Sequence, residues 1–153
     1  MSGSLRERAL VLLARREHAR AELARKLAPH AESVDELNVL LDDLVARRLL
    51  SDERYVEMRM HARGERFGNA RLAYELRTQG VSDELVGAAL AGEIDELARA
   101  WQVWQRKFGN NVGKISEGTN AAAERARQVR FLMSRGFSGE TIRRVLRGDF
   151  END

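Results

Sequence analysis

Two stretches of this 153-residue chain share one pattern of residues. RLAYELRTQGVSDELVGAAL runs from Arg71 to Leu90, and RQVRFLMSRGFSGETIRRVL runs from Arg127 to Leu146. Both place arginine, leucine, glycine and serine at the same positions, and a weaker copy, RAELARKLA, begins at Arg20. Helical units that repeat in this way stack on their neighbours. The repetition therefore predicts a tandem array with long surfaces on its sides.

Apolar residues recur at intervals of three and four along most of the chain, which is typical of amphipathic helices. The sequence shows no strand pattern. The helices are expected near 4–16, 18–28, 33–46, 51–64, 67–79, 82–91, 92–108, 121–135 and 138–147. The predicted fold class is all-α, with three tandem three-helix repeats that form an elongated, curved array. The predicted repeats are 4–46, 51–91 and 92–147.

Start and stop signals divide the array into helices. Four serines, each followed by acidic or polar residues, are expected to cap helix N-termini; they are Ser33, Ser51, Ser82 and Ser138. Ser33 and Glu36 also form a capping-box pattern. Gly80 and Gly136 are expected to end helices in the left-handed conformation, and Pro29 is expected to mark a turn.

Each repeat is expected to bury its own small core of aliphatic residues. The predicted core residues are Leu23, Leu27, Leu40 and Leu44 in the first repeat, Leu72, Leu76, Val86 and Leu90 in the second, and Val129, Leu132, Ile142 and Val145 in the third. Leu97, Trp101, Trp104 and Phe108 recur at helical spacing, which favours core packing over an exposed partner anchor.

The segment 109–120, GNNVGKISEGTN, carries three glycines and three asparagines with few apolar residues. Such a composition can neither bury area nor hold a helix, so it predicts a flexible loop. The tail from Gly148 is acidic, and its composition is compatible with disorder.

Several classes of function lack the residues they need. The chain has no cysteine, and His18, His30 and His61 lack the paired spacing of a metal site, so each is expected to be a surface or partly packed side chain. No nucleophile triad and no phosphate-cradling glycine loop is found in the sequence. We therefore expect no enzyme, no cofactor and no metal. No apolar run is long enough to span a membrane, which favours a cytoplasmic protein.

Charge alternates in sign along the chain although the net charge is only +2. Residues 5–30 carry seven basic and three acidic side chains, whereas residues 32–57 carry three and eight. If the repeats stack in register, basic residues of the middle helices form a discontinuous positive stripe that attracts phosphates or an acidic protein surface. The candidates are Arg20, Arg25, Lys26, Arg71, Arg77, Arg127, Arg130, Arg135, Arg143 and Arg144. No helix shows a base-reading constellation, so sequence specificity is not expected.

Four passages, taken in order, resemble the RecX family of bacterial regulators, which act on the RecA recombinase. They are REHARAELARKL from Arg16, LLSDERYVEMRMHAR from Leu49, RFGNARLAYELRTQGVS from Arg66 and RFLMSRGFSGETIRRVL from Arg130. The pair Gly136 and Phe137 is the most characteristic piece. The chain departs from the usual pattern at Ala19, where the family commonly has a serine, so the second helix is expected to lack a cap.

The resemblance implies three-helix repeats that lie in the groove of RecA filaments on single-stranded DNA. It implies inhibition of ATP hydrolysis, strand exchange and coprotease activity without chemistry by the protein itself, and we expect a monomer. Two other functions stay open: a free-standing nucleic-acid-binding protein that needs no recombinase, and a helical-repeat adaptor for another protein. Binding to DNA in the absence of RecA would favour the nucleic-acid-binding protein. Binding to neither DNA nor RecA would favour the adaptor.

Overall fold

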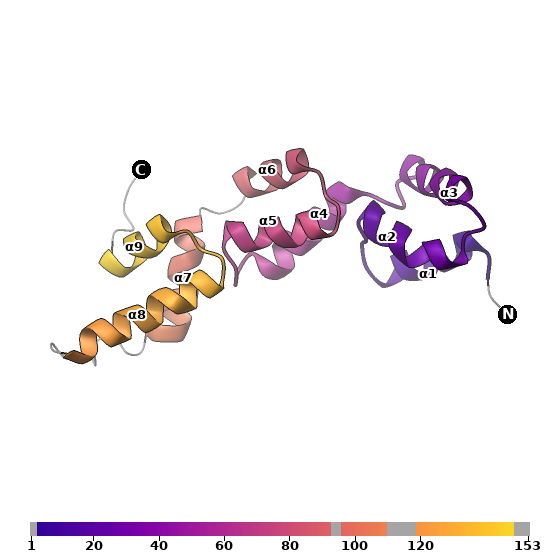
Figure 1. Ribbon diagram of the computed structural model, residues 1–153. Helices are drawn as coiled ribbons and strands as arrows, with labels where there is room; N and C mark the ends of the chain where they lie inside the picture. Colours follow the sequence, from indigo (N-terminus) through magenta and orange to yellow (C-terminus); the bar gives the residue numbers. More distant parts are fainter. Residues whose placement is uncertain (1–2, 93–95, 110–118, 149–153) are drawn as a thin grey trace. The chain divides into compact units, whose positions relative to one another are not determined.

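The computed structural model describes residues 3–92, 96–109 and 119–148, and in these residues the chain forms nine α-helices and no strand (Figure 1). The helices are α1 (Leu5–Arg15), α2 (Arg20–Leu27), α3 (Val34–Ala46), α4 (Asp52–Arg63), α5 (Asn69–Thr78), α6 (Asp83–Gly92), α7 (Glu96–Phe108), α8 (Thr119–Ser134) and α9 (Gly139–Arg147). This confirms the predicted all-α class. The predicted start of α7 at 92 is wrong, because Gly92 is the last residue of α6, and residues 93–95 lie outside the described residues. The other predicted helix ends agree with these bounds to within two residues.

Most of the predicted loop at 109–120 and of the acidic tail also lies outside the described residues. In the described part, α8 begins at Thr119, so the last two residues of the predicted loop are helical. None of the described helices is long and apolar enough to cross a lipid bilayer.

The chain folds into two compact units. The first unit contains Met1–Arg59 and Glu75–Ala89, and the second contains Met60–Tyr74 and Leu90–Asp153. Helices α4, α5 and α6, which make up the predicted second repeat, therefore contribute residues to both units. The boundaries of the three predicted repeats stay a prediction.

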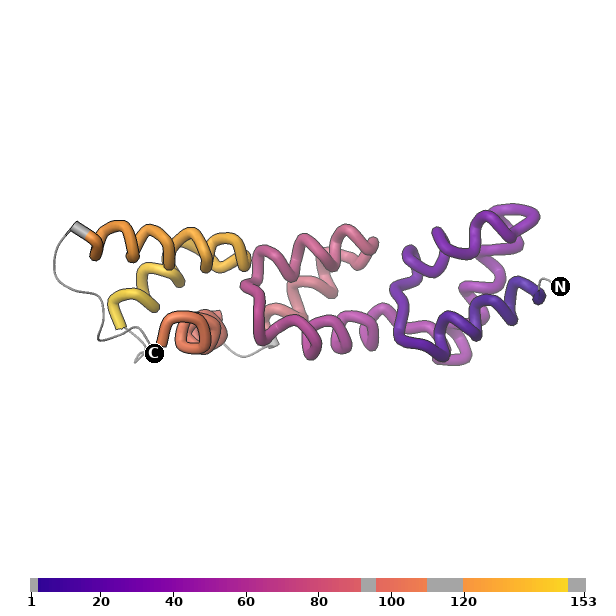
Figure 2. Tube along the Cα trace, turned by 90° about the horizontal axis from the view of Figure 1, so that it is seen from below, coloured from indigo at the N-terminus to yellow at the C-terminus, as the bar shows by residue number. Residues whose placement is uncertain are grey.

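The core of the first unit lies between α1, α2 and α3, which contact one another (Figure 2). The four leucines predicted for the first repeat are all buried in it, and Ala9, Leu37, Leu41 and Leu50 join them. Burying a leucine side chain contributes about 1.5–3 kcal/mol. This is why α1, whose outer face is charged, still holds its place through one apolar stripe.

The core of the second unit lies between α7, α8 and α9, which also contact one another. Leu132, Ile142 and Val145 are buried there as predicted, and Val129 is half-buried against them. Trp101 and Trp104 pack against this cluster, which confirms their expected role in the core. Of the residues predicted for the second repeat, Leu72, Leu76 and Val86 are buried and Leu90 is half-buried.

The predicted helix signals are present at the atomic level. The hydroxyl of each of the four serines accepts a hydrogen bond from the amide three residues on, at 3.0–3.2 Å. The capping box at Ser33 differs in detail, because the Glu36 carboxylate accepts from the amide of Glu32. Pro29 lies in a short 3₁₀ turn, η1 (Ala28–His30), directly after α2.

Gly80 and Gly136 end α5 and α8 in the same way. Their φ angles are +84° and +89°, and the amide after each glycine donates to a carbonyl five residues back, at Leu76 and Leu132. This is the Schellman arrangement, in which glycine enters the left-handed region at the lowest cost. The shared sequence pattern therefore encodes the same turn twice.

The start of α2 shows how the missing serine at Ala19 is replaced. Ala19 has no side-chain acceptor, as expected, and its own amide donates to the Glu22 carboxylate at 3.3 Å. The next amide, that of Arg20, donates to Asp52 at 2.7 Å, from the first residue of α4. A carboxylate distant in sequence thus accepts one of the free amides at this helix end.

Candidate anion-binding surface

The structure divides the ten predicted stripe residues between the two units. Arg20, Arg25, Lys26 and Arg77 belong to the first unit, and Arg71, Arg127, Arg130, Arg135, Arg143 and Arg144 belong to the second. A single stripe across the array stays a prediction, and the surroundings of these cations can be compared within each unit.

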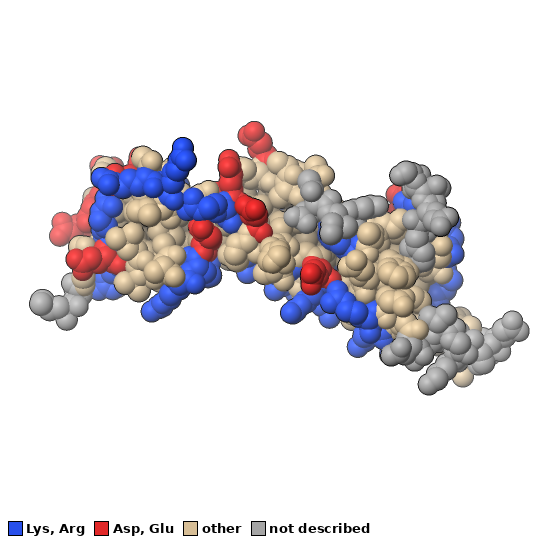
Figure 3. All heavy atoms as spheres, turned by 180° about the vertical axis from the view of Figure 1, so that it is seen from behind, with Lys and Arg blue, Asp and Glu red and all other residues tan. Residues whose placement is uncertain are grey.

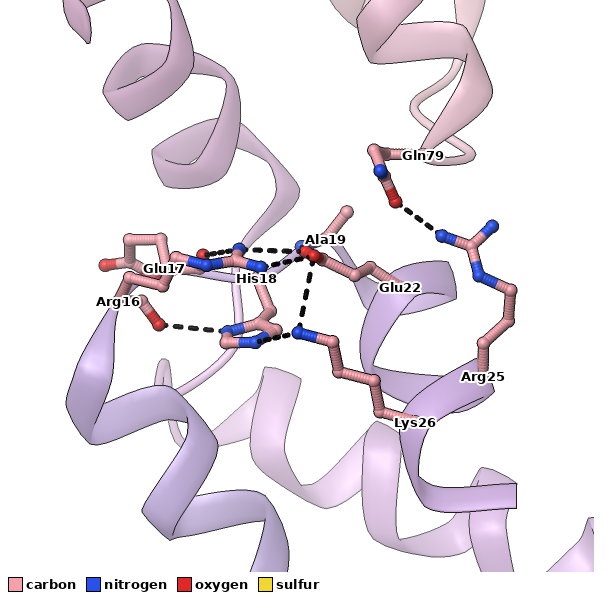
Figure 4. A network of polar contacts seen from close by, with 8 residues as sticks. All are labelled: Arg16, Glu17, His18, Ala19, Glu22, Arg25, Lys26 and Gln79. Atoms are coloured by element: carbon pink, nitrogen blue, oxygen red, sulfur yellow. Dashed lines mark hydrogen bonds and ion pairs between the residues drawn. The ribbon is translucent and has the colours of Figure 1, made fainter. Parts of the chain in front are cut away.

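The predicted stripe residues of the first unit lie next to carboxylates or amides. Arg20 pairs with Asp42 at 2.7 Å, and Arg77 pairs with Asp83 at 2.8 Å. The guanidinium of Arg25 donates to the Gln79 side chain (Figure 4). Because each charge already has a partner within the unit, these residues are positioned by the fold itself.

A denser network surrounds Glu22, whose side chain is only 8% exposed (Figure 4). Arg16 donates to both carboxylate oxygens of Glu22, at 3.1 and 2.5 Å, and the Lys26 ammonium lies 3.7 Å away. A bidentate arginine–carboxylate pair is the strongest common form of ion pair. Lys26, a predicted stripe residue, therefore bonds within α2 and to the connection that precedes it.

His18 lies at the centre of this network and corrects a prediction. It was expected on the surface or partly packed, but only 1% of it is exposed. Its Nδ1 lies 3.0 Å from the Arg16 carbonyl and its Nε2 lies 3.1 Å from the Lys26 ammonium. Since an ammonium can only donate, Nε2 accepts from Lys26 and Nδ1 carries the hydrogen of a neutral ring.

The pKa values of this network follow from its burial. Burial lowers the pKa of His18 below 6.5, although the hydrogen bond to the Arg16 carbonyl acts in the opposite direction. For Glu22, burial raises the pKa, but the hydrogen bond and charge of Arg16, together with His18 and the Ala19 amide, outweigh it and leave the pKa below 4.5. The pair is thus held in its ionised form and the histidine in its neutral form.

Cations of the second unit are placed differently, because several lie over aromatic rings. The guanidinium carbons of Arg63, Arg71 and Arg135 lie 4.4, 4.4 and 5.2 Å from the centre of the Phe67 ring. Arg135 also lies 5.0 Å from the ring centre of Phe131. Cation–π contacts of this kind position the side chain and leave its positive charge in place.

Hydrogen bonds to backbone carbonyls join sequence-distant segments and bring these arginines together. The amide of Gly68 donates to the carbonyl of Arg135 at 2.8 Å, and the Arg71 guanidinium donates to the carbonyl of Ser134 at 3.0 Å. From α7, Arg99 donates to the Phe67 carbonyl at 3.1 Å. The connection between α4 and α5 is thereby fixed against both α7 and the end of α8.

The remaining predicted residues of the second unit are spread over α8 and α9. Arg127 pairs with Glu124 at 2.8 Å and lies 5.3 Å from the ring centre of Phe108. Arg130 and Arg143 have exposed side chains, and Arg144 is half-buried. Of the predicted set in this unit, the structure therefore brings Arg71 and Arg135 together.

Next to this cluster is a pocket of about 350 Å³ in the second unit. Its lining residues are Arg66, Val103, Arg106, Lys107, Phe131 and Arg135. Sequence reasoning missed Arg66, Arg106 and Lys107, because they lie outside the repeated passages. Arg106 and Lys107 end a helix, where a basic pair already complements the helix dipole, so the sequence offers only a weak signal there.

The two units also differ in charge. By sequence, the first unit carries 12 Lys and Arg against 14 Asp and Glu, a net charge of −2. The second carries 14 against 10, a net charge of +4. In the face that Figure 3 displays, acidic and basic side chains lie side by side on the first unit. A net positive unit with clustered arginines attracts anions.

Comparison with known proteins now adds to this geometry. Residues 51–90 match the family model for the second three-helix domain of RecX, and residues 93–146 match the model for the third. The regulatory protein RecX of Leptothrix cholodnii is 51% identical over 152 residues, covering 98% of this chain and 92% of that protein. The chain belongs to the RecX family.

Other members agree with this assignment. The regulatory protein RecX of Ralstonia nicotianae is 48% identical over 146 residues, which cover 95% of this chain and 87% of that protein. The crystal structure of RecX from Lactobacillus salivarius superimposes with a TM-score of 0.79 at 19% identity, covering 95% of this chain and 94% of that one. The RecX resemblance stated from the sequence is therefore confirmed, and the fold is shared with a solved RecX structure.

Proposed function

We propose that this protein binds RecA filaments on single-stranded DNA and inhibits ATP hydrolysis, strand exchange and coprotease activity of the recombinase. Membership of the RecX family supports a regulatory role, since its relatives are regulatory proteins by name. The observation that carries the proposal further is the positively charged second unit, where arginines cluster around Phe67. A filament of protein and DNA offers both phosphates and acidic patches to such a surface.

The protein acts in this proposal by occupancy alone, as a monomer in the cytoplasm. In the described residues, no group of three or more histidine, aspartate or glutamate side chains is arranged to hold a metal ion. The histidine with a displaced pKa, His18, is enclosed by Arg16 and Lys26 and faces a network that the fold itself uses. Its burial explains that pKa without a catalytic role.

The test is the rate of ATP hydrolysis by preformed RecA filaments on single-stranded DNA, titrated with this protein at fixed salt. Inhibition at concentrations well below those that coat naked DNA supports the proposal. Inhibition only when the DNA is saturated would instead favour a free-standing nucleic-acid-binding protein. No effect on filaments and no binding to DNA would favour an adaptor for another protein.

Charge reversal tests the part of the surface on α8. Reversing Arg127, Arg130 and Arg135 to Glu is expected to abolish inhibition with unchanged helix content. Because Arg135 also packs over two rings, Arg130→Glu alone is the cleaner variant, and we expect it to weaken inhibition several-fold. Arg125→Glu is the matched control, since Arg125 is exposed on the same helix outside the predicted set. Equal effects of Arg130→Glu and Arg125→Glu would remove this surface from the mechanism.

A further inference from the structure

The pocket of the second unit gathers four cations from three separate segments. Arg66 comes from the connection between α4 and α5, Arg106 and Lys107 come from the end of α7, and Arg135 follows α8. Among the described residues, no aspartate or glutamate lines the pocket. The rest of the lining is apolar, from Val103 and Phe131. Like charges held this close repel one another, so the fold keeps a concentration of positive charge here that a bound anion would stabilise.

The partners of these cations leave their charge uncancelled. Arg106 donates to the backbone carbonyl of Glu65 at 2.7 Å, and Lys107 and Arg135 lie 5.3 and 5.0 Å from the ring centre of Phe131. Within the described residues, none of the four has a carboxylate within ion-pair distance. This contrasts with Arg20 and Arg77 of the first unit, which pair with aspartates.

We propose that this pocket holds a backbone phosphate of single-stranded nucleic acid. Three of its cations are arginines, whose planar forks bind phosphate oxygens in pairs, and lysine adds a point charge. A phosphodiester has a charged oxygen pair beside an apolar sugar, which matches a cationic pocket with an apolar side. This inference rests on the proposed function, in which the protein contacts the single-stranded DNA of the filament. It names the backbone phosphate as the chemical group that the protein binds there.

The same geometry predicts contact without base recognition. A base would need a free aromatic face for stacking. The Phe131 ring already carries Lys107 and Arg135 over it, and Phe108 meets it edge-on with ring centres 5.4 Å apart. The strand is therefore held through its backbone, and affinity is independent of base identity.

The experiment measures binding of the protein alone to fluorescent oligo(dT), without RecA, across a series of salt concentrations. The variant carries Arg66→Gln and Lys107→Gln, and the control carries Arg125→Gln and Arg147→Gln, which remove the same charge from exposed positions of the same unit outside the predicted set. We expect about tenfold weaker binding and a shallower salt dependence for the variant, by about one unit of slope, and less than twofold weakening for the control. An abasic strand of the same length is expected to bind as tightly as oligo(dT).

Equal weakening in variant and control would overturn the pocket as a site, since it would show diffuse attraction only. Tighter binding of oligo(dT) than of the abasic strand would overturn backbone recognition, and equally strong binding of poly-glutamate would overturn phosphate as the ligand class. Thermal unfolding of the variant verifies that it folds. As a measurement that needs no variant, the side-chain N–H signals of Arg66 and Arg106 in the wild-type protein are expected to shift with oligo(dT).

The outcome for RecA is separate. If the wild-type protein inhibits filament ATP hydrolysis but does not bind oligo(dT) through the pocket, the phosphate site is wrong and the proposed function stands. If it binds oligo(dT) through the pocket and leaves filaments unaffected, the phosphate site stands and the proposed function is wrong.

Discussion

Two groups of arginines, one in each unit of this protein, are held by different kinds of partner. In the first unit, Arg16 neutralises a buried carboxylate at 2.5 Å, and in the second, Arg63 and Arg71 lie over the ring of Phe67. A carboxylate cancels the charge it holds, whereas a ring fixes the side chain and leaves its charge acting on the surroundings. The comparison indicates that the pair of Arg16 and Glu22 serves the fold of the first unit, and that ring contacts position arginines in the second unit.

The largest expected effect concerns the two glycine turns, which the sequence presents as equivalent. A Cβ at Gly136 would lie 2.4 Å from the Arg71 Cβ and 2.7 Å from its backbone nitrogen, whereas one at Gly80 would meet the Ala21 Cβ at 2.5 Å. Both alanine variants are strained by positive φ, and Gly136→Ala also forces backbone apart. We expect Gly136→Ala to cost about 3–4 kcal/mol and Gly80→Ala about 2 kcal/mol.

Chemical unfolding followed by circular dichroism measures this difference. Gly87→Ala in α6 is the matched control, because nothing lies within 4 Å of its Cβ, and it is expected to stabilise by about 0.5–1 kcal/mol. A larger loss for Gly80→Ala than for Gly136→Ala would show that the close approach of Arg71 to Gly136 does not limit the side chain at position 136.

The next effect compares a buried ion pair with a more exposed one. Glu22→Gln leaves the Arg16 guanidinium without its carboxylate in a site where the glutamate side chain is 8% exposed. We expect a loss of about 2–3 kcal/mol of unfolding free energy. Glu124→Gln, which removes the half-buried partner of the exposed Arg127, is expected to cost much less. Similar losses in both variants would contradict the difference drawn between the units.

The smallest effect is the pH dependence of the first unit. Because the pKa of His18 is lowered in the folded state, the unfolded chain binds more protons, and stability falls as the pH drops below 6.5 towards the folded value. Glu22, whose pKa is also lowered, contributes stability above 4.5 that is lost as the pH falls through its folded value. Both groups destabilise the first unit in acid.

Amide hydrogen exchange at about pH 7.5 and about pH 5.5 separates the two units. Protection in α1 and α2 is expected to decrease at the lower pH, and protection in α7 and α9 is expected to stay constant. His18→Gln, which keeps an acceptor for Lys26 without a titrating ring, is expected to remove the difference. A uniform decrease across both units would contradict the assignment to His18.

Much of the local structure follows from short sequence signals. Four serines and two glycines predict the helix ends correctly because each acts on amides or carbonyls only a few residues away. The apolar spacing predicts the buried leucines for the same reason, since a helix converts a period of three to four into one face. The burial of His18 was not predicted, because its enclosure depends on Lys26 of the following helix.

The cap of α2 shows the limit most clearly. Ala19 in place of a serine predicts that the helix lacks a side-chain cap. Only the folded chain places the Asp52 carboxylate against the amide of Arg20. The candidate site has the same character. Arg71 and Arg135 could be selected from the repeated pattern. Arg66, Arg106 and Lys107 could not, because only the folded chain places them in one pocket with Arg135.

The sequence by itself determined the all-α fold, the helix ends, the aliphatic core and the membership of the RecX family, because these depend on periodicity and local chemistry. Only the tertiary structure decided which arginines are neutralised and which share a pocket. The physical reason is that charge acts over distances set by packing, and packing joins residues such as Gly68 and Arg135 that the chain holds far apart.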